Sequence, residues 1–105
     1  MSGQLQYGLN GLNGHNGKFF IDKESYLVIK DEQTFTFPRK EFELLILLAS
    51  KPGKVFTRSE ISNAIWNREA KSGARSIDVY IRHIRKKLGE DVIYTVVGVG
   101  YKLIV

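Results

Sequence analysis

The chain has 105 residues, of which 43% are apolar and 11% aromatic, so it can form one domain with a hydrophobic core. It has no cysteine, which excludes a disulfide scaffold and thiolate metal sites, and two histidines do not make a metal cluster. Its net charge is +5, and no apolar run approaches the roughly 18 residues of a membrane-spanning helix. The N-terminus also lacks a secretory signal, so we expect a cytoplasmic protein with no cofactor, metal or membrane partner.

Residues 1–17 differ from the rest of the chain. They contain five glycines, three asparagines and no charged residue. Such a segment has too little to bury against the entropy of ordering it. We therefore expect a flexible linker or tail over 1–17, too short to hold a further domain, and a folded domain over 18–105.

Three short segments rich in β-branched and aromatic residues follow the tail. They are Lys18–Asp22, Tyr26–Lys30 and Thr34–Phe37, and polar residues typical of turns separate them. The pattern predicts a three-stranded antiparallel meander.

The next segment predicts a first helix that Pro38 opens and Lys51-Pro52-Gly53 ends. Its apolar residues recur at helical spacing, at Phe42, Leu45, Ile46 and Ala49. Additional leucines widen the stripe, so we expect this helix to be buried on most sides.

A second helix is predicted from Thr57-Arg58-Ser59-Glu60, which has the form of a capping box, through Trp66. We expect Ile61, Ala64 and Ile65 to form its core face. The polar residues Asn67–Gly73 predict a loop.

A third helix is predicted over Arg75–Leu88, with Gly89 placed to cap its end. One face is apolar, with Ile77, Ile81, Ile84 and Leu88, and the opposite face carries Arg75, Val79, Arg82, His83 and Lys86. The segment Lys71–Lys87 holds six basic residues and one acidic residue, a net of +5, while the rest of the chain balances at 10 against 10. A solvated amphipathic helix would also show such a pattern, but a concentrated positive stripe is typical of a protein that binds a polyanion.

Two β-type segments around Gly98-Val99-Gly100 predict a C-terminal hairpin, Val92–Val97 and Tyr101–Val105. The expected fold is therefore α+β: an N-terminal antiparallel sheet, three helices and a β-hairpin wing, with a helix-turn-helix formed by the second and third helices.

In this order, the elements resemble the winged-helix DNA-binding domain of OmpR/PhoB-type response regulators. The matching residues are Pro38–Ile61, Trp66, Arg75–Gly89 and Thr95–Leu103. The resemblance implies sequence-specific binding of promoter DNA in a two-component regulatory system, with Arg75–Leu88 in the major groove and Thr95–Tyr101 near the minor groove. It implies no enzymatic activity. It also implies a four-stranded leading sheet, whose fourth strand we place near Phe35–Phe37.

The resemblance implies DNA-binding roles for thirteen residues. Those implied to contact the sugar–phosphate backbone are Arg58, Trp66, Arg75, Ser76, Tyr80, Arg82, Arg85, Thr95 and Tyr101. Those implied to face base edges are Asp78, Val79 and His83, and Lys86 can neutralise a phosphate from the same helix face.

Several of these residues also have structural interpretations. Trp66 and Tyr101 can belong to the core, Tyr80 can pack against the wing, and Asp78 can orient Arg82, four residues further along the helix. The wing departs from the family, since Val97 stands where a basic residue is usual.

The expected partners follow from the same resemblance. They are double-stranded promoter DNA and, through the loop Asn67–Gly73, RNA polymerase. The isolated domain is expected to be a monomer that forms a tandem head-to-tail dimer on DNA. The alternative is a winged-helix interaction module whose basic helix binds an acidic protein, because a fold does not by itself fix a function.

Overall fold

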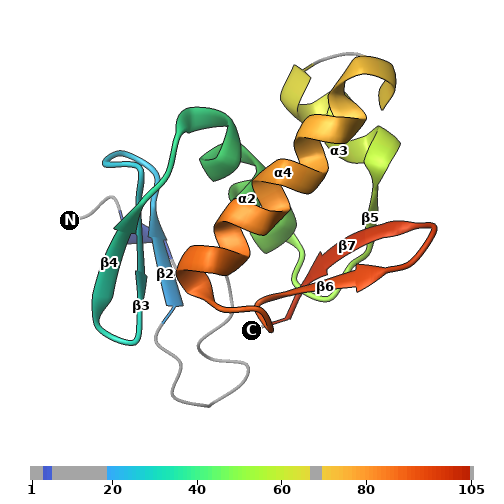
Figure 1. Cartoon of the computed structure of the whole chain (residues 1–105). Helices are drawn as coiled ribbons and strands as arrows, with labels where there is room; N and C mark the ends of the chain where they lie inside the picture. Colours follow the sequence, from blue (N-terminus) through green and yellow to red (C-terminus); the bar gives the residue numbers. More distant parts are fainter. Residues whose placement is uncertain (1–3, 6–18, 67–69, 105) are drawn as a thin grey trace.

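The computed structural model describes residues 4–5, 19–66 and 70–104, with side chains over 19–66 and 76–104. The described residues form an N-terminal antiparallel sheet, the helices α2, α3 and α4, and a second, smaller sheet (Figure 1). Helix α4 lies in front of α2 and runs between the two sheets. The predicted α+β winged-helix architecture is confirmed.

The N-terminal sheet has four strands in the order β1-β2-β3-β4, which are Gln4–Leu5, Phe19–Asp22, Leu27–Lys30 and Gln33–Thr36. All neighbours pair antiparallel, so the predicted meander is confirmed. The position of the fourth strand was predicted wrongly. The segment near Phe35–Phe37 contributes to β4, and the additional strand is β1, from within residues 1–17, which pairs Leu5 with Ile21.

The hairpin turn between β3 and β4 has two residues in a left-handed backbone conformation. They are Asp31, at φ 51°, and Glu32, at φ 69°. Two-residue hairpin turns with both φ values positive match the twist of the strands, but they favour Asn and Gly. The charged pair therefore fits the turn geometry at a conformational cost.

Glu32→Gly is expected to raise the free energy of unfolding by about 0.5–1 kcal/mol, because glycine adopts positive φ without the Cβ penalty. Chemical denaturation measures the change. Glu24→Gly, in the neighbouring β2–β3 turn at a position without positive φ, is the control and is expected to destabilise slightly. A destabilised Glu32→Gly variant would contradict the account of this turn.

The predicted first helix is present as α2, Arg39–Ser50, but Pro38 is its N-cap residue, with ψ 153°, and not its first helical residue. The wide apolar face expected from its additional leucines is confirmed. Leu44 and Leu48 are fully buried, Ile46 is half-buried, and the face also includes the charged residue Glu41.

The capping box at the start of α3, Arg58–Trp66, is confirmed. The Glu60 amide donates to the Thr57 hydroxyl over 3.1 Å, and the Thr57 amide donates to the Glu60 carboxylate over 2.8 Å. The predicted core face is partly wrong: Ile61 and Ile65 are buried, but Ala64 is exposed and Ser62 is buried in its place.

The helix α4 spans Ala70–Leu88, so it begins before the predicted Arg75. Residues 70–73 of the predicted loop belong to this helix, and 67–69 lie outside the described residues. The polar composition of 67–73 predicted a loop. Within 70–74, however, only Gly73 has a strongly unfavourable helix propensity, so a helix can form there.

The second sheet has the order β5-β7-β6, with strands Phe56–Thr57, Gly100–Leu103 and Ile93–Val96. Strands β6 and β7 form the predicted hairpin, while β5, just before α3, was not predicted. Gly98 has φ 80° and makes the turn, with the Val99 amide bonded to the Val96 carbonyl over 2.9 Å. Gly100 serves a different purpose, because a Cβ there would lie 1.9 Å from the Phe56 carbonyl oxygen.

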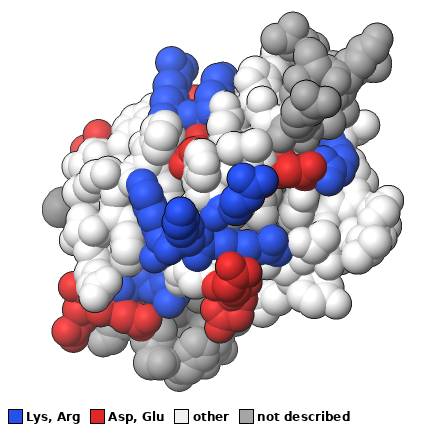
Figure 2. All heavy atoms as spheres, viewed as in Figure 1, with Lys and Arg blue, Asp and Glu red and all other residues white. Residues whose placement is uncertain are grey.

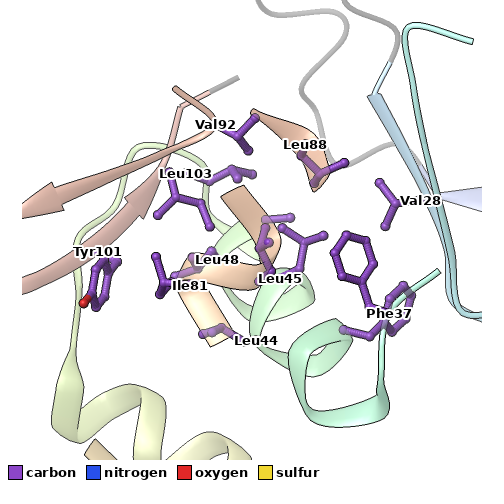
Figure 3. Packing of buried hydrophobic residues seen from close by; sticks show 14 of the residues in the cluster. Val28, Phe37, Leu44, Leu45, Leu48, Ile81, Leu88, Val92, Tyr101 and Leu103 are labelled. Carbon is purple, nitrogen blue, oxygen red and sulfur yellow. The ribbon is translucent and has the colours of Figure 1, made fainter. Parts of the chain in front are cut away.

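The hydrophobic core joins all these layers (Figure 3). Leucines of α2 meet Ile81 and Leu88 of α4 at its centre, between Val28 and Phe37 on one side and Leu103 and Tyr101 on the other. The predicted apolar stripe of α4 is confirmed, since Ile77, Ile81, Ile84 and Leu88 are all buried. This packing fixes which side of α4 faces solvent.

Candidate nucleic-acid interface

The exposed side of α4 is a basic surface. Figure 2 shows Lys and Arg side chains gathered across the middle of the face on which α4 lies, while the side of the wing is mostly uncharged. The α4 residues exposed there are Arg82, His83, Lys86 and Lys87. Such a surface attracts a polyanion.

Two of the predicted DNA-binding cations remain available for an external partner. Arg82 and Lys86 are four residues apart, so they lie on the same side of the helix. Neither side chain makes a hydrogen bond or an ion pair with any side chain or backbone group of the described residues. Phosphate groups could therefore bind both without displacing an internal contact.

Asp78 joins α4 to the start of α3 and to the wing. Its Oδ1 atom lies 2.7 Å from Arg58 Nη2 and accepts a 2.6 Å hydrogen bond from the Tyr101 hydroxyl. The Arg58 guanidinium also lies near the face of the Tyr101 ring, 5.6 Å from its centroid. The alternative that Asp78 pairs with Arg82 is not supported, because its hydrogen-bond partners are Arg58 and Tyr101.

This cluster shifts the acid–base equilibria of its members. Partial burial acts to raise the pKa of Asp78, but hydrogen bonds from Tyr101 and Arg58 and the charges of Arg58 and Arg82 outweigh it, so the pKa is lowered. Burial, followed by the hydrogen bond to Asp78, raises the pKa of Tyr101. Asp78 is therefore held in its ionised form at neutral pH.

Asp78→Asn is expected to lower the melting temperature at pH 7 and to lose this effect in acid. Since the folded-state pKa of Asp78 lies below its unfolded value, the carboxylate stabilises the fold above about pH 4, and this stabilisation disappears as the pH falls through the lowered pKa. Thermal unfolding at pH 7 and pH 3 measures the difference. Asp91→Asn, at an exposed position, is the control. If Asp78→Asn lowers the melting temperature equally at pH 7 and pH 3, the prediction is contradicted.

Arg85 binds the wing from the opposite end of the helix face. Its Nη2 donates to the Ile93 carbonyl over 2.6 Å and to the Thr95 hydroxyl over 2.8 Å, and its Nε donates to the same carbonyl over 3.2 Å. Two residues that we predicted as separate DNA contacts thus bind each other. Their first role is to hold β6 against α4.

The aromatic pair Trp66 and Tyr80 forms a third contact between predicted site residues. Their rings stack at a centroid distance of 5.8 Å, and both are half-buried. Tyr80 therefore packs against α3, and the interpretation that it packs against the wing is wrong. Ser76 and Val79 are half-buried on α4, and the side chain of Arg75 lies outside the described ones.

His83 is paired with an acidic residue that the sequence analysis did not identify. Its Nδ1 lies 2.6 Å from Oε2 of Glu41 on α2. The His83 side chain is 48% exposed, whereas that of Glu41 is 5% exposed. A lone acid at i−3, i−4 and i−7 from Leu44, Leu45 and Leu48 was the signal that could have revealed it.

The tip of the wing is apolar and faces solvent. Val97 is 88% exposed, and Val99 is exposed on the other side of Gly98. No charged side chain occupies the tip, so its contribution to binding a polyanion does not come from an ion pair.

The family profile described as "Transcriptional regulatory protein, C terminal" matches residues 32–103, which include all three helices and the wing. The chain belongs to this family. The matched region includes α4 and its basic face.

Individual relatives agree with this family. The transcriptional regulatory protein SrrA of Staphylococcus aureus is 38% identical over 88 residues, covering 78% of this chain and 36% of SrrA. The chain thus spans about a third of the length of this curated relative. The response regulator DrrB of Thermotoga maritima, an OmpR/PhoB homologue, is 32% identical with a TM-score of 0.73, covering 87% of this chain and 43% of DrrB.

A DNA-bound structure is also similar. The DNA-binding domain of the response regulator AdeR, in complex with an intercistronic region, is 29% identical with a TM-score of 0.68. The match covers 87% of this chain and 96% of that domain. Among the described residues of the present chain, none of the helices has the length and apolar composition that a membrane span requires.

Proposed function

We propose that this domain binds double-stranded promoter DNA sequence-specifically, as the effector domain of a two-component response regulator. The exposed side of α4 enters the major groove, and the wing lies near the minor groove. The protein acts in the cytoplasm, and its role is binding without a catalytic step.

The observation that carries this proposal is the separation of α4 into an apolar side docked on the core and a cationic side with Arg82 and Lys86 available. A major groove admits one α-helix, and cations on its exposed side can neutralise phosphates on either strand. Membership of the transcriptional regulator family and the AdeR complex support the same function.

The internal contacts described above divide eleven of the thirteen proposed site residues into two groups. Arg82 and Lys86 approach DNA directly, with Val79 and His83 on the same side of the helix. The residues that position this surface are Arg58, Trp66, Asp78, Tyr80, Arg85, Thr95 and Tyr101. Their contacts connect α3, α4, β6 and β7, and they can reach the DNA backbone from those positions. Arg75 and Ser76 extend the DNA-binding surface toward the start of the helix.

Selection of bound sequences from a random DNA pool tests the proposal. We expect enrichment of one motif, with an affinity at least about a thousandfold above that for unrelated DNA. The logarithm of the affinity is expected to fall linearly with the logarithm of the salt concentration. Binding with no enriched motif would contradict sequence-specific recognition. Tight binding to an acidic protein fragment with no DNA preference would instead favour the interaction-module alternative.

We also infer two assembly properties from the family. The isolated domain is a monomer that pairs head-to-tail on direct repeats, and the segment Asn67–Gly73, of which 67–69 lie outside the described residues, contacts RNA polymerase. Sedimentation with and without DNA tests the first property, and a stable dimer without DNA would contradict it. Crosslinking from position 72 to the polymerase on promoter DNA tests the second.

A further inference from the structure

The contact between Glu41 and His83 links a buried carboxylate to the basic surface of α4. Glu41 lies in the first turn of α2, where the helix dipole favours a negative charge, so we take its carboxylate as the acceptor and His83 Nδ1–H as the donor. An imidazole has two distinct nitrogens, and a hydrogen bond at one of them decides the state of the other. With Nδ1 held by Glu41, Nε2 is the nitrogen left for a partner.

The positions of Glu41 and His83 indicate which partner can reach Nε2. Glu41 is almost completely buried between α2 and α4, whereas nearly half of the His83 side chain is exposed. His83 comes directly after Arg82 and three residues before Lys86, so it lies beside both available cations. A polyanion bound to those cations also meets the exposed edge of the imidazole.

Other charged groups of α2, α3 and α4 already have partners among the described residues. On α2, Lys40 binds the Ile65 carbonyl of α3 and lies 3.5 Å from Glu43, which also pairs with Arg39. On α4, Lys87 binds the Thr36 carbonyl and covers the Phe37 ring. At the start of α3, Arg58 pairs with Asp78, and Glu60 accepts from the Thr57 amide. The cations that remain beside His83 are Arg82 and Lys86.

We propose that Glu41 is a positioning residue for DNA recognition, which fixes the ring and tautomer of His83 so that Nε2 alone meets the DNA. The neutral ring presents a lone pair at Nε2, and the protonated ring presents an N–H donor at the same place. The protonated ring binds an acceptor atom of DNA, either a phosphate oxygen or the N7 or O6 of guanine. This inference rests on the proposed DNA-binding function.

The first test uses the free domain and needs no DNA. Nitrogen-15 NMR of the histidine ring at pH 8 is expected to place the proton of His83 on Nδ1. Glu41→Gln keeps an acceptor oxygen and is expected to keep this tautomer, whereas Glu41→Leu removes the acceptor and is expected to give a mixture. A wild-type proton on Nε2, or no difference between the two variants, would overturn the proposal.

The second test measures DNA affinity at pH 6 and pH 8, on the duplex that the wild-type domain selects from a random pool. The neutral ring has no donor at Nε2, whereas the protonated ring donates a charged hydrogen bond there, so we expect wild-type affinity to rise about fivefold at pH 6. His83→Asn places its amide near Nδ1, which keeps the contact with Glu41 but removes Nε2, and the rise is expected to vanish. Folded Glu41→Leu is expected to show a rise below about twofold.

These variants separate positioning from general stability. If Glu41→Leu does not fold, His83→Asn and His83→Gln still form a matched pair. Asn keeps the contact with Glu41, whereas Gln places its amide near Nε2 and loses that contact. A full pH response in His83→Asn or in folded Glu41→Leu would overturn the proposal. A rise confined to the selected duplex identifies guanine as the acceptor, and an equal rise on a scrambled duplex identifies phosphate. If the wild type binds no DNA, the proposed function fails, while the NMR result still judges the tautomer.

Discussion

Gly100→Ala is expected to destabilise the domain by about 3 kcal/mol or more, which for a chain of this size lowers the melting temperature by roughly 12 °C or more. The reason is steric. A Cβ on Gly100 would lie 1.9 Å from the Phe56 carbonyl oxygen, 2.8 Å from its carbonyl carbon and 2.9 Å from the Thr57 Cα. All three atoms belong to the backbone of β5, so no side-chain rotation can relieve the contact. Thermal and urea-induced unfolding both measure the loss.

Gly98→Ala is the matched control, two residues away in the same wing. Gly98 has φ 80° and open space around it, so alanine there costs only the strain of a positive φ, about 1–2 kcal/mol. We expect the two variants to differ clearly in stability. Equal melting temperatures would show that β5 does not pack as closely on β7 as described.

Arg82→Ala is expected to weaken binding to every DNA duplex by about 1–3 kcal/mol and to flatten the dependence of log affinity on log salt by about one unit. Arg82 is exposed on α4 and makes no hydrogen bond or ion pair within the part of the chain that the structure describes, so its removal leaves the fold intact. We expect the melting temperature of the free domain to fall only slightly, because the charge of Arg82 is the smallest of the causes that lower the pKa of Asp78. Fluorescence anisotropy titrations at several salt concentrations measure the effect.

Lys23→Ala removes the same charge from a turn of the N-terminal sheet and is the control. It is expected to change affinity and salt dependence much less, since the turn is not on α4. If Arg82→Ala weakens binding to one sequence and leaves the salt slope unchanged, Arg82 reads a base and does not bind a phosphate.

Local signals in the sequence predicted most of the fold. The capping box at Thr57, the apolar spacing of Ile77, Ile81 and Ile84, and the turn glycine at position 98 each have a local physical cause, and each is confirmed. The two-residue strand β5 carries no such signal. It exists because Phe56 and Thr57 lie beside β7, a contact between residues more than 40 positions apart.

The candidate site was predicted as a surface but not as a set of contacts. Helical periodicity places Arg82, His83 and Lys86 on one side of α4, and their exposure confirms it. Periodicity cannot show that Arg85 binds the Ile93 carbonyl or that Asp78 binds Tyr101, because those partners come from strands whose position depends on the whole fold. The acid beside His83 was missed for the same reason, since it belongs to a different helix.

The position of α4 between the two sheets has a consequence for solubility. Strand β4 lies at an edge of the first sheet and β6 at an edge of the second, and exposed strand edges invite pairing with other molecules. Two basic side chains of α4 each bind a backbone carbonyl of one edge strand, Lys87 that of Thr36 and Arg85 that of Ile93. A bulky charged group at each carbonyl hinders an incoming strand. The helix that carries the proposed DNA-binding surface therefore also hinders strand pairing at these two carbonyls.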